Sequence, residues 1–136
     1  MTVFVLDSSA VVRFLDKEAG WDRIAAILLA HSEETAKAAI SAMQWGEIAG
    51  IVRRKRGAAA QSSTLQDLAY FQLQIVAATG KRAVHAAEIK QDRKLPYANA
   101  YALDLAMDSA DHVLVTADYD FKAVADLAQI EFLPAK

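Results

Sequence analysis

The chain has 136 residues, of which 54% are hydrophobic and 24% are charged, a length that suits one domain with a substantial buried core. It contains no cysteine, which excludes disulfides, thiol nucleophiles and thiolate metal sites, and fits a reducing cytoplasm. The formal net charge of −2 gives no overall positive field for nucleic acids, and no uncharged window is long enough to span a membrane.

The first half of the chain is predicted to alternate short strands with helices. Its opening apolar run ends at Asp7, too early for a secretory signal, and is typical of a strand buried on both faces. Apolar residues then recur at helical spacing, and Gly57 ends the last helix of this half. The predicted elements are a strand at Thr2–Leu6, helices at Ala10–Leu15 and from Trp21 to about His31, a weak strand at Ala38–Ser41, and a helix from Ala42 to about Arg56.

The second half leaves one stretch open to two interpretations. Either a helix capped within Ser62–Thr64 precedes a strand at Phe71–Ala77, where apolar residues and glutamines alternate, or one helix runs from Thr64 to Ala78. The remaining predicted elements are a helix at Gly80–Gln91 capped by Thr79, a helix at Tyr97–Met107, a strand at Val113–Thr116, a short helix through Phe121–Ala128 and a strand at Ile130–Leu133. This alternation favours an α/β fold with a central, mostly parallel sheet of four to five strands and helices on both faces.

Acidic residues follow two of these strands at the point where each strand ends. Asp7 follows the first strand, and Asp118 and Asp120 follow the strand at Val113–Thr116. Open parallel sheets bind their ligands outside the carboxyl ends of the strands. The alternative is structural: Asp7 and Asp118 cap the helices that follow, and Asp120 is a solvated first-turn acid. Glu47, near the start of an intervening helix among apolar and small residues, is expected to point inward or into a cleft.

Other polar residues receive structural expectations first. Asn99 is expected to cap its helix or lie in the first turn, Asp104 to face solvent, and His85 to be an ordinary surface or packing histidine. The basic run Arg53–Arg56 suits a helix C-terminus, with contact to a phosphate backbone as its alternative role. The residues considered for that contact are Arg53, Arg54, Lys55 and Arg56.

The donor types indicate the chemistry. Oxygen ligands without paired His or Cys favour Mg²⁺ or Mn²⁺ over zinc, and converging carboxylates repel one another unless a cation lies among them. Such a cation can bind phosphoryl oxygens and activate water, which favours phosphodiester hydrolysis. Acyl or redox chemistry has no GxSxG, Walker-type loop or GxGxxG to support it. A receiver-like phosphoacceptor fold is a distant alternative, because the acid pair and lysine it requires do not occur in the expected order.

Four segments together resemble a PIN-domain ribonuclease and, more narrowly, the VapC-type toxin of a type II toxin–antitoxin system. They are VFVLDSSA, the helix that bears Glu47, LPYANAYALDLA and LVTADYDF. The resemblance covers essentially residues 1–136 as a single PIN domain. It implies a Mg²⁺- or Mn²⁺-dependent endoribonuclease acting on structured RNA such as tRNA or rRNA. It also implies a homodimer, and an antitoxin whose tail fills the active-site groove.

Position by position, the resemblance also implies site residues. Asp7 and Asp118 are the direct metal ligands, and Glu47 orients water or a second cation. Ser9 and Thr116 correspond to hydroxyls that brace the acids. The full acidic cluster comprises Asp7, Glu47, Asp118 and Asp120.

One position departs from the family pattern. Asn99 stands where the family usually has Asp, one of its core acids. Asn keeps the shape and one carbonyl oxygen but not the charge, so cation binding should weaken and a water there loses an acceptor for its proton. The chain is therefore either an endoribonuclease impaired by a natural or introduced Asn99, or a non-catalytic module that binds an antitoxin or RNA without turnover.

Overall fold

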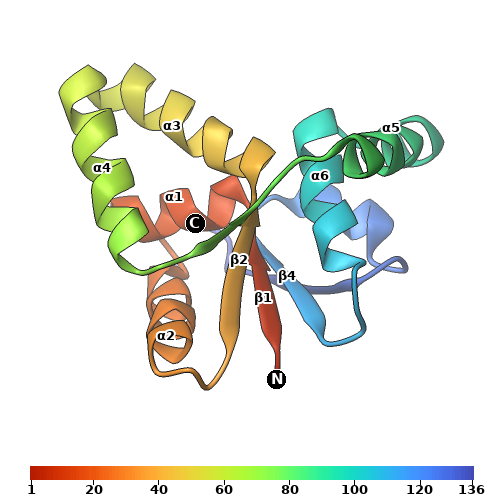
Figure 1. The fold of residues 1–136 in the computed structure, drawn as a ribbon, viewed down its shortest axis with the longest axis horizontal. Coiled ribbons are helices and arrows are strands. Elements are labelled where there is room, and N and C mark those ends of the chain that lie inside the picture. The colour runs from red at the N-terminus through yellow and green to blue at the C-terminus, as the bar shows by residue number, and fades with distance from the viewer.

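A computed structural model describes residues 1–136 and shows a parallel sheet between two layers of helices (Figure 1). The five strands lie in the order β3-β2-β1-β4-β5, and every neighbouring pair is parallel. The predicted fold class is therefore confirmed. The strands are β1 (Val3–Leu6), β2 (Lys37–Ser41), β3 (Gln74–Val76), β4 (His112–Thr116) and β5 (Gln129–Phe132).

The helices divide between the two faces because successive strand residues point to opposite sides. Val5 and Leu114 pack against α5, α6 and η1, whereas Leu6 and Val115 pack against α1 to α4. The helices are α1 (Ser8–Asp16), α2 (Trp21–Ser32), α3 (Ala42–Arg56), α4 (Ala58–Tyr70), α5 (Gly80–Arg93), α6 (Tyr97–Ala106) and the 3₁₀ helix η1 (Tyr119–Val124). None of these helices combines the length and the apolar character that a membrane crossing requires.

The chain order creates a switch point at the carboxyl end of β1. From this central strand the chain crosses to β2 on one side and later reaches β4 on the other. Leu6 pairs with Val115, so the residues that follow β1 and β4 emerge side by side. Open α/β sheets bind ligands in the crevice at such a point.

Three helix boundaries agree with the sequence because side chains and a glycine set them locally. Ser41 Oγ accepts a hydrogen bond from Met43 N at the start of α3, and Gly57, with a φ of 89°, follows the helix at its end. The hydroxyl of Thr79 likewise accepts from Arg82 N at the start of α5. These are the N-cap and C-terminal signals on which the predictions relied.

The stretch after Gly57 is a helix followed by a strand, as in the first sequence interpretation, but with different bounds. A new helix, α4, begins at Ala58 directly after Gly57, so the cap predicted within Ser62–Thr64 is wrong, as is a helix continuing to Ala78. Gln72, with a φ of 58°, turns the chain after α4 and leaves room only for the short strand Gln74–Val76. The helix predicted through Phe121–Ala128 is instead the six-residue η1.

Candidate active site

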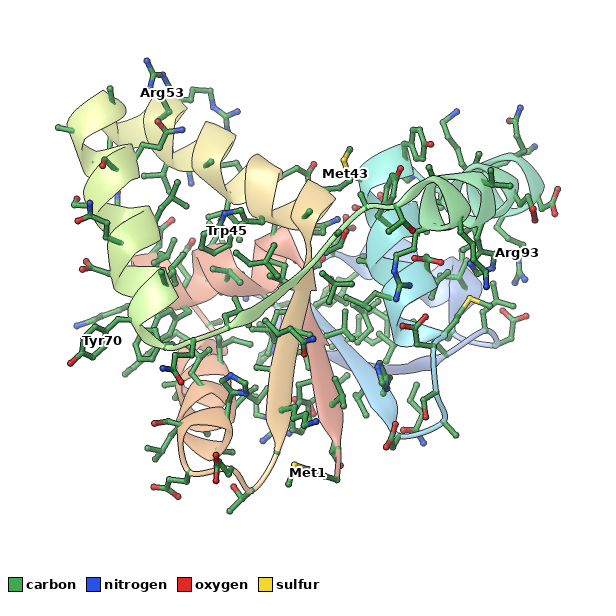
Figure 2. The ribbon with its side chains drawn as sticks, viewed as in Figure 1. Met1, Met43, Trp45, Arg53, Tyr70 and Arg93 are labelled. Carbon is green, nitrogen blue, oxygen red and sulfur yellow. The ribbon has the colours of Figure 1, made fainter.

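Side chains from four elements meet at the carboxyl edge of the sheet. Asp7 directly follows β1 and Asp118 lies just beyond β4. The first turns of α3 and α6 cover the same edge, since Gln44 of α3 bonds to Ala98 of α6. In Figure 2 the labelled Met43 marks this place, between the starts of the two helices.

Asp7 is buried, with 1% of its surface exposed, and its carboxylate is fully engaged. Thr116 Oγ1 donates to Oδ2 at 2.7 Å, Ser9 Oγ donates to Oδ1 at 2.8 Å, and the N–H of Ala10 donates to Oδ1 at 3.0 Å. The last bond makes Asp7 the N-cap of α1. The structural interpretation of Asp7 is therefore correct, and it does not exclude a functional role.

Burial raises the pKa of Asp7 to about 6. Hydrogen bonds from Thr116, Ala10 and Ser9 act in the opposite direction, and the nearby negative charge of Asp118 raises the pKa a little further. The ionised form of Asp7 is thus unfavourable in the folded chain, and a cation near this carboxylate would relieve that cost.

Asp118 is linked to Asp7 through one hydroxyl. The N–H of Asp118 donates to Thr116 Oγ1 at 2.9 Å, and the same hydroxyl donates to Asp7. On its other side, Asn99 Nδ2 donates to Asp118 Oδ2 at 2.9 Å. Asn99 lies in the first turn of α6, as expected, but its side chain bonds across to Asp118 instead of capping its own helix.

Glu47 faces the same edge from α3. It is exposed rather than buried, and its Oε1 accepts a hydrogen bond from Ser8 Oγ at 3.0 Å. Ser8 directly follows Asp7 in the sequence, so Glu47 contacts the neighbour of the buried acid and not the acid itself. The structure links Asp7 to Asp118 through the Thr116 hydroxyl and Asp118 directly to Asn99, and it places Glu47 at the border of this group.

Gln44 is a positioning residue that the sequence analysis missed. It is fully buried, accepts a hydrogen bond from Ser8 N at 2.7 Å, and donates to Ala98 O at 2.6 Å. This one side chain therefore joins the segment after Asp7, the start of α3 and the start of α6. Its sequence signal is a polar residue three positions before Glu47, on the face of α3 that turns inward.

We expect Gln44→Leu to lower the free energy of unfolding by about 2 kcal/mol, because Ser8 N–H and Ala98 C=O lose their partner in a buried place. Gln66→Leu, on the exposed surface of α4, is the matched control and should change stability little. Urea denaturation of the three chains measures both effects. Equal stability of the Gln44→Leu chain and the control would contradict the bridging role.

Asp120 and the basic run lie apart from these contacts. Asp120 is exposed, and only its backbone N–H reaches the group, donating to Asp118 Oδ1 at 3.0 Å. In Figure 2, Arg53 lies at the far end of α3 from Met43. Lys55 and Arg56 both pair with Asp16, at 3.4 and 2.5 Å.

A family model described as PIN domain matches residues 4–127. The chain belongs to the PIN domain family. The resemblance inferred from the four sequence segments is confirmed at this level, and PIN domains are generally nucleases. A search of curated protein sequences found no match.

Solved structures with this PIN fold include chains of several VapBC complexes. VapBC2 from Rickettsia felis, bound to a DNA fragment from their promoter, matches with a TM-score of 0.73 and 15% identity, over 98% of this chain and 100% of that chain. DNA-bound VapBC from Salmonella typhimurium matches with a TM-score of 0.74 and 15% identity, over 97% and 98%. A toxin–antitoxin complex from Klebsiella pneumoniae matches with 0.62 and 19%, over 89% and 90%. At these identities the likeness shows a shared fold.

The donor atoms of this PIN domain suit a hard divalent cation. Asp7 and Asp118 carry carboxylate oxygens, the donors that Mg²⁺ and Mn²⁺ prefer, whereas Asn99 turns its amide nitrogen toward Asp118. No three His, Asp or Glu side chains are grouped so that they could hold a metal ion. The side chain directly beside Asp118 is the uncharged amide of Asn99.

Asp104 corrects one sequence expectation. It was expected to face solvent, but only 5% of it is exposed. Arg82 Nη1 lies 3.0 Å from Asp104 Oδ2, and His85 Nδ1 lies 2.7 Å from Oδ1. Arg82 and His85 lie on α5, so Asp104 joins α6 to α5, two helices that cover the same face of the sheet. A single helix pattern could not reveal partners that arrive from a neighbouring helix.

Proposed function

We propose that this PIN domain, as a single domain over residues 1–136, is a divalent-metal-dependent endoribonuclease toxin of a type II toxin–antitoxin pair. Its substrate is structured RNA, tRNA or rRNA, and its activity is impaired by Asn99. The main support is that Asp7 and Asp118 are joined through the Thr116 hydroxyl, with Asn99 hydrogen-bonded to Asp118, at the switch point of the sheet. The fold shared with VapBC complexes supports an antitoxin partner. Its resemblance to VapC-type toxins further suggests a homodimer in the cytoplasm.

In this proposal Asp7 and Asp118 hold Mg²⁺ or Mn²⁺, and Glu47 orients water or a second cation. Asp120 adds negative charge at the rim of the site. When bound, the cation supplies Lewis-acid polarisation of a phosphoryl oxygen and lowers the pKa of a water molecule. Ser9 and Thr116 fix the Asp7 carboxylate through hydrogen bonds of 2.8 and 2.7 Å, so its orientation does not depend on the substrate.

A second candidate, a non-catalytic module that binds an antitoxin or RNA, is favoured by one observation. The chain has no group of three acids that could hold a metal ion, and the side chain beside Asp118 is the uncharged Asn99. The folded chain would then bind an antitoxin or RNA in its groove without cleaving RNA. The two candidates differ in a single measurable property, which is cleavage of RNA.

The test is incubation of the purified chain with total cellular RNA, with and without Mn²⁺, followed by mapping of new RNA ends. We expect slow, Mn²⁺-dependent cleavage at few positions, and its loss in Asp7→Ala, because the buried metal ligand is gone. Asp67→Ala, which changes an exposed acid on α4, is the control and should cleave like the parent. Absence of cleavage both in this chain and in Asn99→Asp would leave the binding module as the function.

A further inference from the structure

A hollow of about 560 Å³ lies beside the candidate active site, and its lining is basic. It is formed by the corner between α5 and α6, with Lys94 and Pro96, and by η1, with Tyr119 and Lys122. Both segments continue into the site, since Pro96 precedes Asn99 by three residues and Tyr119 directly follows Asp118. The hollow therefore adjoins the candidate active site along both segments.

The basic side chains that line this hollow differ in whether a carboxylate already pairs with them. Arg93 Nη2 lies 2.5 Å from Asp126 Oδ1, so its charge is largely compensated. Lys94 and Lys122 form no ion pair with any carboxylate in the structure. Asp120 is the one acid in the lining, so the two lysines leave the hollow with an excess of positive charge. The basic run of α3, in contrast, shares Asp16 between two of its cations.

The Lys122 side chain is held by aromatic rings, and Lys94 has a defined backbone conformation at the end of α5. The Lys122 ammonium lies 4.9 Å from the centroid of the Tyr119 ring and 5.9 Å from that of Phe132, within cation–π range. The Tyr119 hydroxyl donates to Leu133 O at 2.7 Å, which fixes the ring beneath the ammonium. Lys94 ends α5 in a left-handed conformation with a φ of 56°, between that helix and the buried Leu95.

We propose that Lys94 and Lys122 bind phosphates of the RNA strand next to the scissile bond. This inference rests on the proposed function, because the acidic site defines where the scissile bond lies. A lysine recognises phosphate as a point charge. Two ammonium groups without a carboxylate partner beside an acidic site draw in a strand that the overall charge of −2 does not attract. The phosphate-binding surface thus lies on the α6 side of the site, opposite the basic run of α3.

The test measures the affinity of the parent chain and its variants for a fluorescein-labelled single-stranded RNA oligonucleotide by fluorescence anisotropy. EDTA is present throughout, and the measurement is repeated at several salt concentrations. Lys94→Gln/Lys122→Gln should weaken binding roughly 10- to 30-fold at 0.1 M salt. It should also reduce the salt slope by about 1.4, since each phosphate contact on a single strand contributes about 0.7. The matched control is Lys17→Gln/Lys37→Gln, which removes the same charge and also changes one left-handed helix-end lysine, Lys17 with a φ of 51°.

Equal affinity and equal salt slope in the two double variants would overturn the inference. The inference would also fail if the Lys94/Lys122 pair were needed to bind poly-glutamate but not RNA, because the surface would then serve an acidic peptide. The readout is independent of cleavage. If Asn99→Asp cleaves RNA while the two double-lysine variants bind RNA equally well, the lysine assignment is wrong and the proposed function stands. If binding falls but no chain cleaves, the phosphate contact is supported and the nuclease proposal fails.

Discussion

Replacing Asn99 by Asp should raise the rate of Mn²⁺-dependent RNA cleavage by about 100-fold or more, the range that a lost proton acceptor or charge-stabilising group accounts for. Asn99 Nδ2 lies 2.9 Å from Asp118 Oδ2, so Asp at this position sets a second carboxylate against the first. With Asp at position 99, the site has three acids, at positions 7, 99 and 118, instead of two. The measurement is the initial rate of cleavage at the mapped positions, and equal rates in the Asn and Asp forms would remove position 99 from the site.

The same substitution should make the stability of the fold depend on a cation. Without divalent metal, Asn99→Asp exchanges a hydrogen bond for repulsion between two carboxylates, and its Tm should fall by several degrees below that of the parent. Saturating Mn²⁺ should recover this loss, because a ligand that binds only the folded state stabilises it. This readout reports metal binding even where cleavage is slow.

Two further variants separate charge from shape at this contact. Asn99→Asp/Asp118→Asn exchanges the two side chains and keeps one carboxylate, one amide and a possible hydrogen bond between them. We expect it to cleave no faster than the parent, because the number of acids at the site is unchanged. Asp7→Ala added to Asn99→Asp should abolish the gained cleavage. A fast exchange variant would show that the position of the charge matters and the number of acids does not.

The sheet and its switch point could be predicted because the deciding signals are local. Apolar runs end abruptly at Asp7 and before Asp118, and parallel strands deliver such residues to one edge regardless of the loops between them. The start of α3 at Ala42 was equally local, because Ser41 and Gly57 set its limits. The junction after Gly57 could not be predicted, since alanine-rich sequence is compatible with a helix at many registers, and only packing of Leu68 into the core selects one.

The candidate site was predictable in its acids and not in its connections. Gln44 and Asp104 are buried polar residues whose partners come from other helices. The partners of Gln44 lie 36 and 54 residues away in the sequence, and those of Asp104 lie 19 and 22 residues away. No helical period distinguishes such residues from solvent-facing ones. Asn99 was singled out by its departure from a family pattern, and only the structure links its amide to Asp118.

Replacing Asp7 by Asn should stabilise the metal-free chain above pH 6 by up to about 3 kcal/mol. The pKa of Asp7 is about 6 in the folded chain, against about 3.9 in an unfolded one. Folding therefore favours the protonated acid. The free energy of unfolding of the parent should fall as the pH rises from about 4 to 6, and the loss should be complete above pH 6.

Asp7→Asn removes this titration, so its unfolding free energy should be flat through that window, apart from the slope contributed by other groups. Asp67→Asn, an exposed acid on α4, is the control and should keep the slope of the parent. Urea denaturation between pH 4 and pH 8 measures all three chains. The diagnostic quantity is the difference between the parent and Asp7→Asn, because other acids contribute the same slope to both chains. A difference that does not change between pH 4 and 7 would show that burial does not raise the pKa of Asp7.

Adding Mn²⁺ to the same series distinguishes a structural N-cap from a metal ligand at Asp7. If Asp7 holds the cation, Mn²⁺ competes with the proton, so it should stabilise the parent above pH 6 and progressively less below it. Asp7→Asn still caps α1 through its amide oxygen but should lose most of this pH-dependent stabilisation. The burial that makes the carboxylate unfavourable in the empty chain would then be the reason that the site takes up a cation at neutral pH. A stabilisation by Mn²⁺ that is equal in both chains would assign Asp7 to the fold alone.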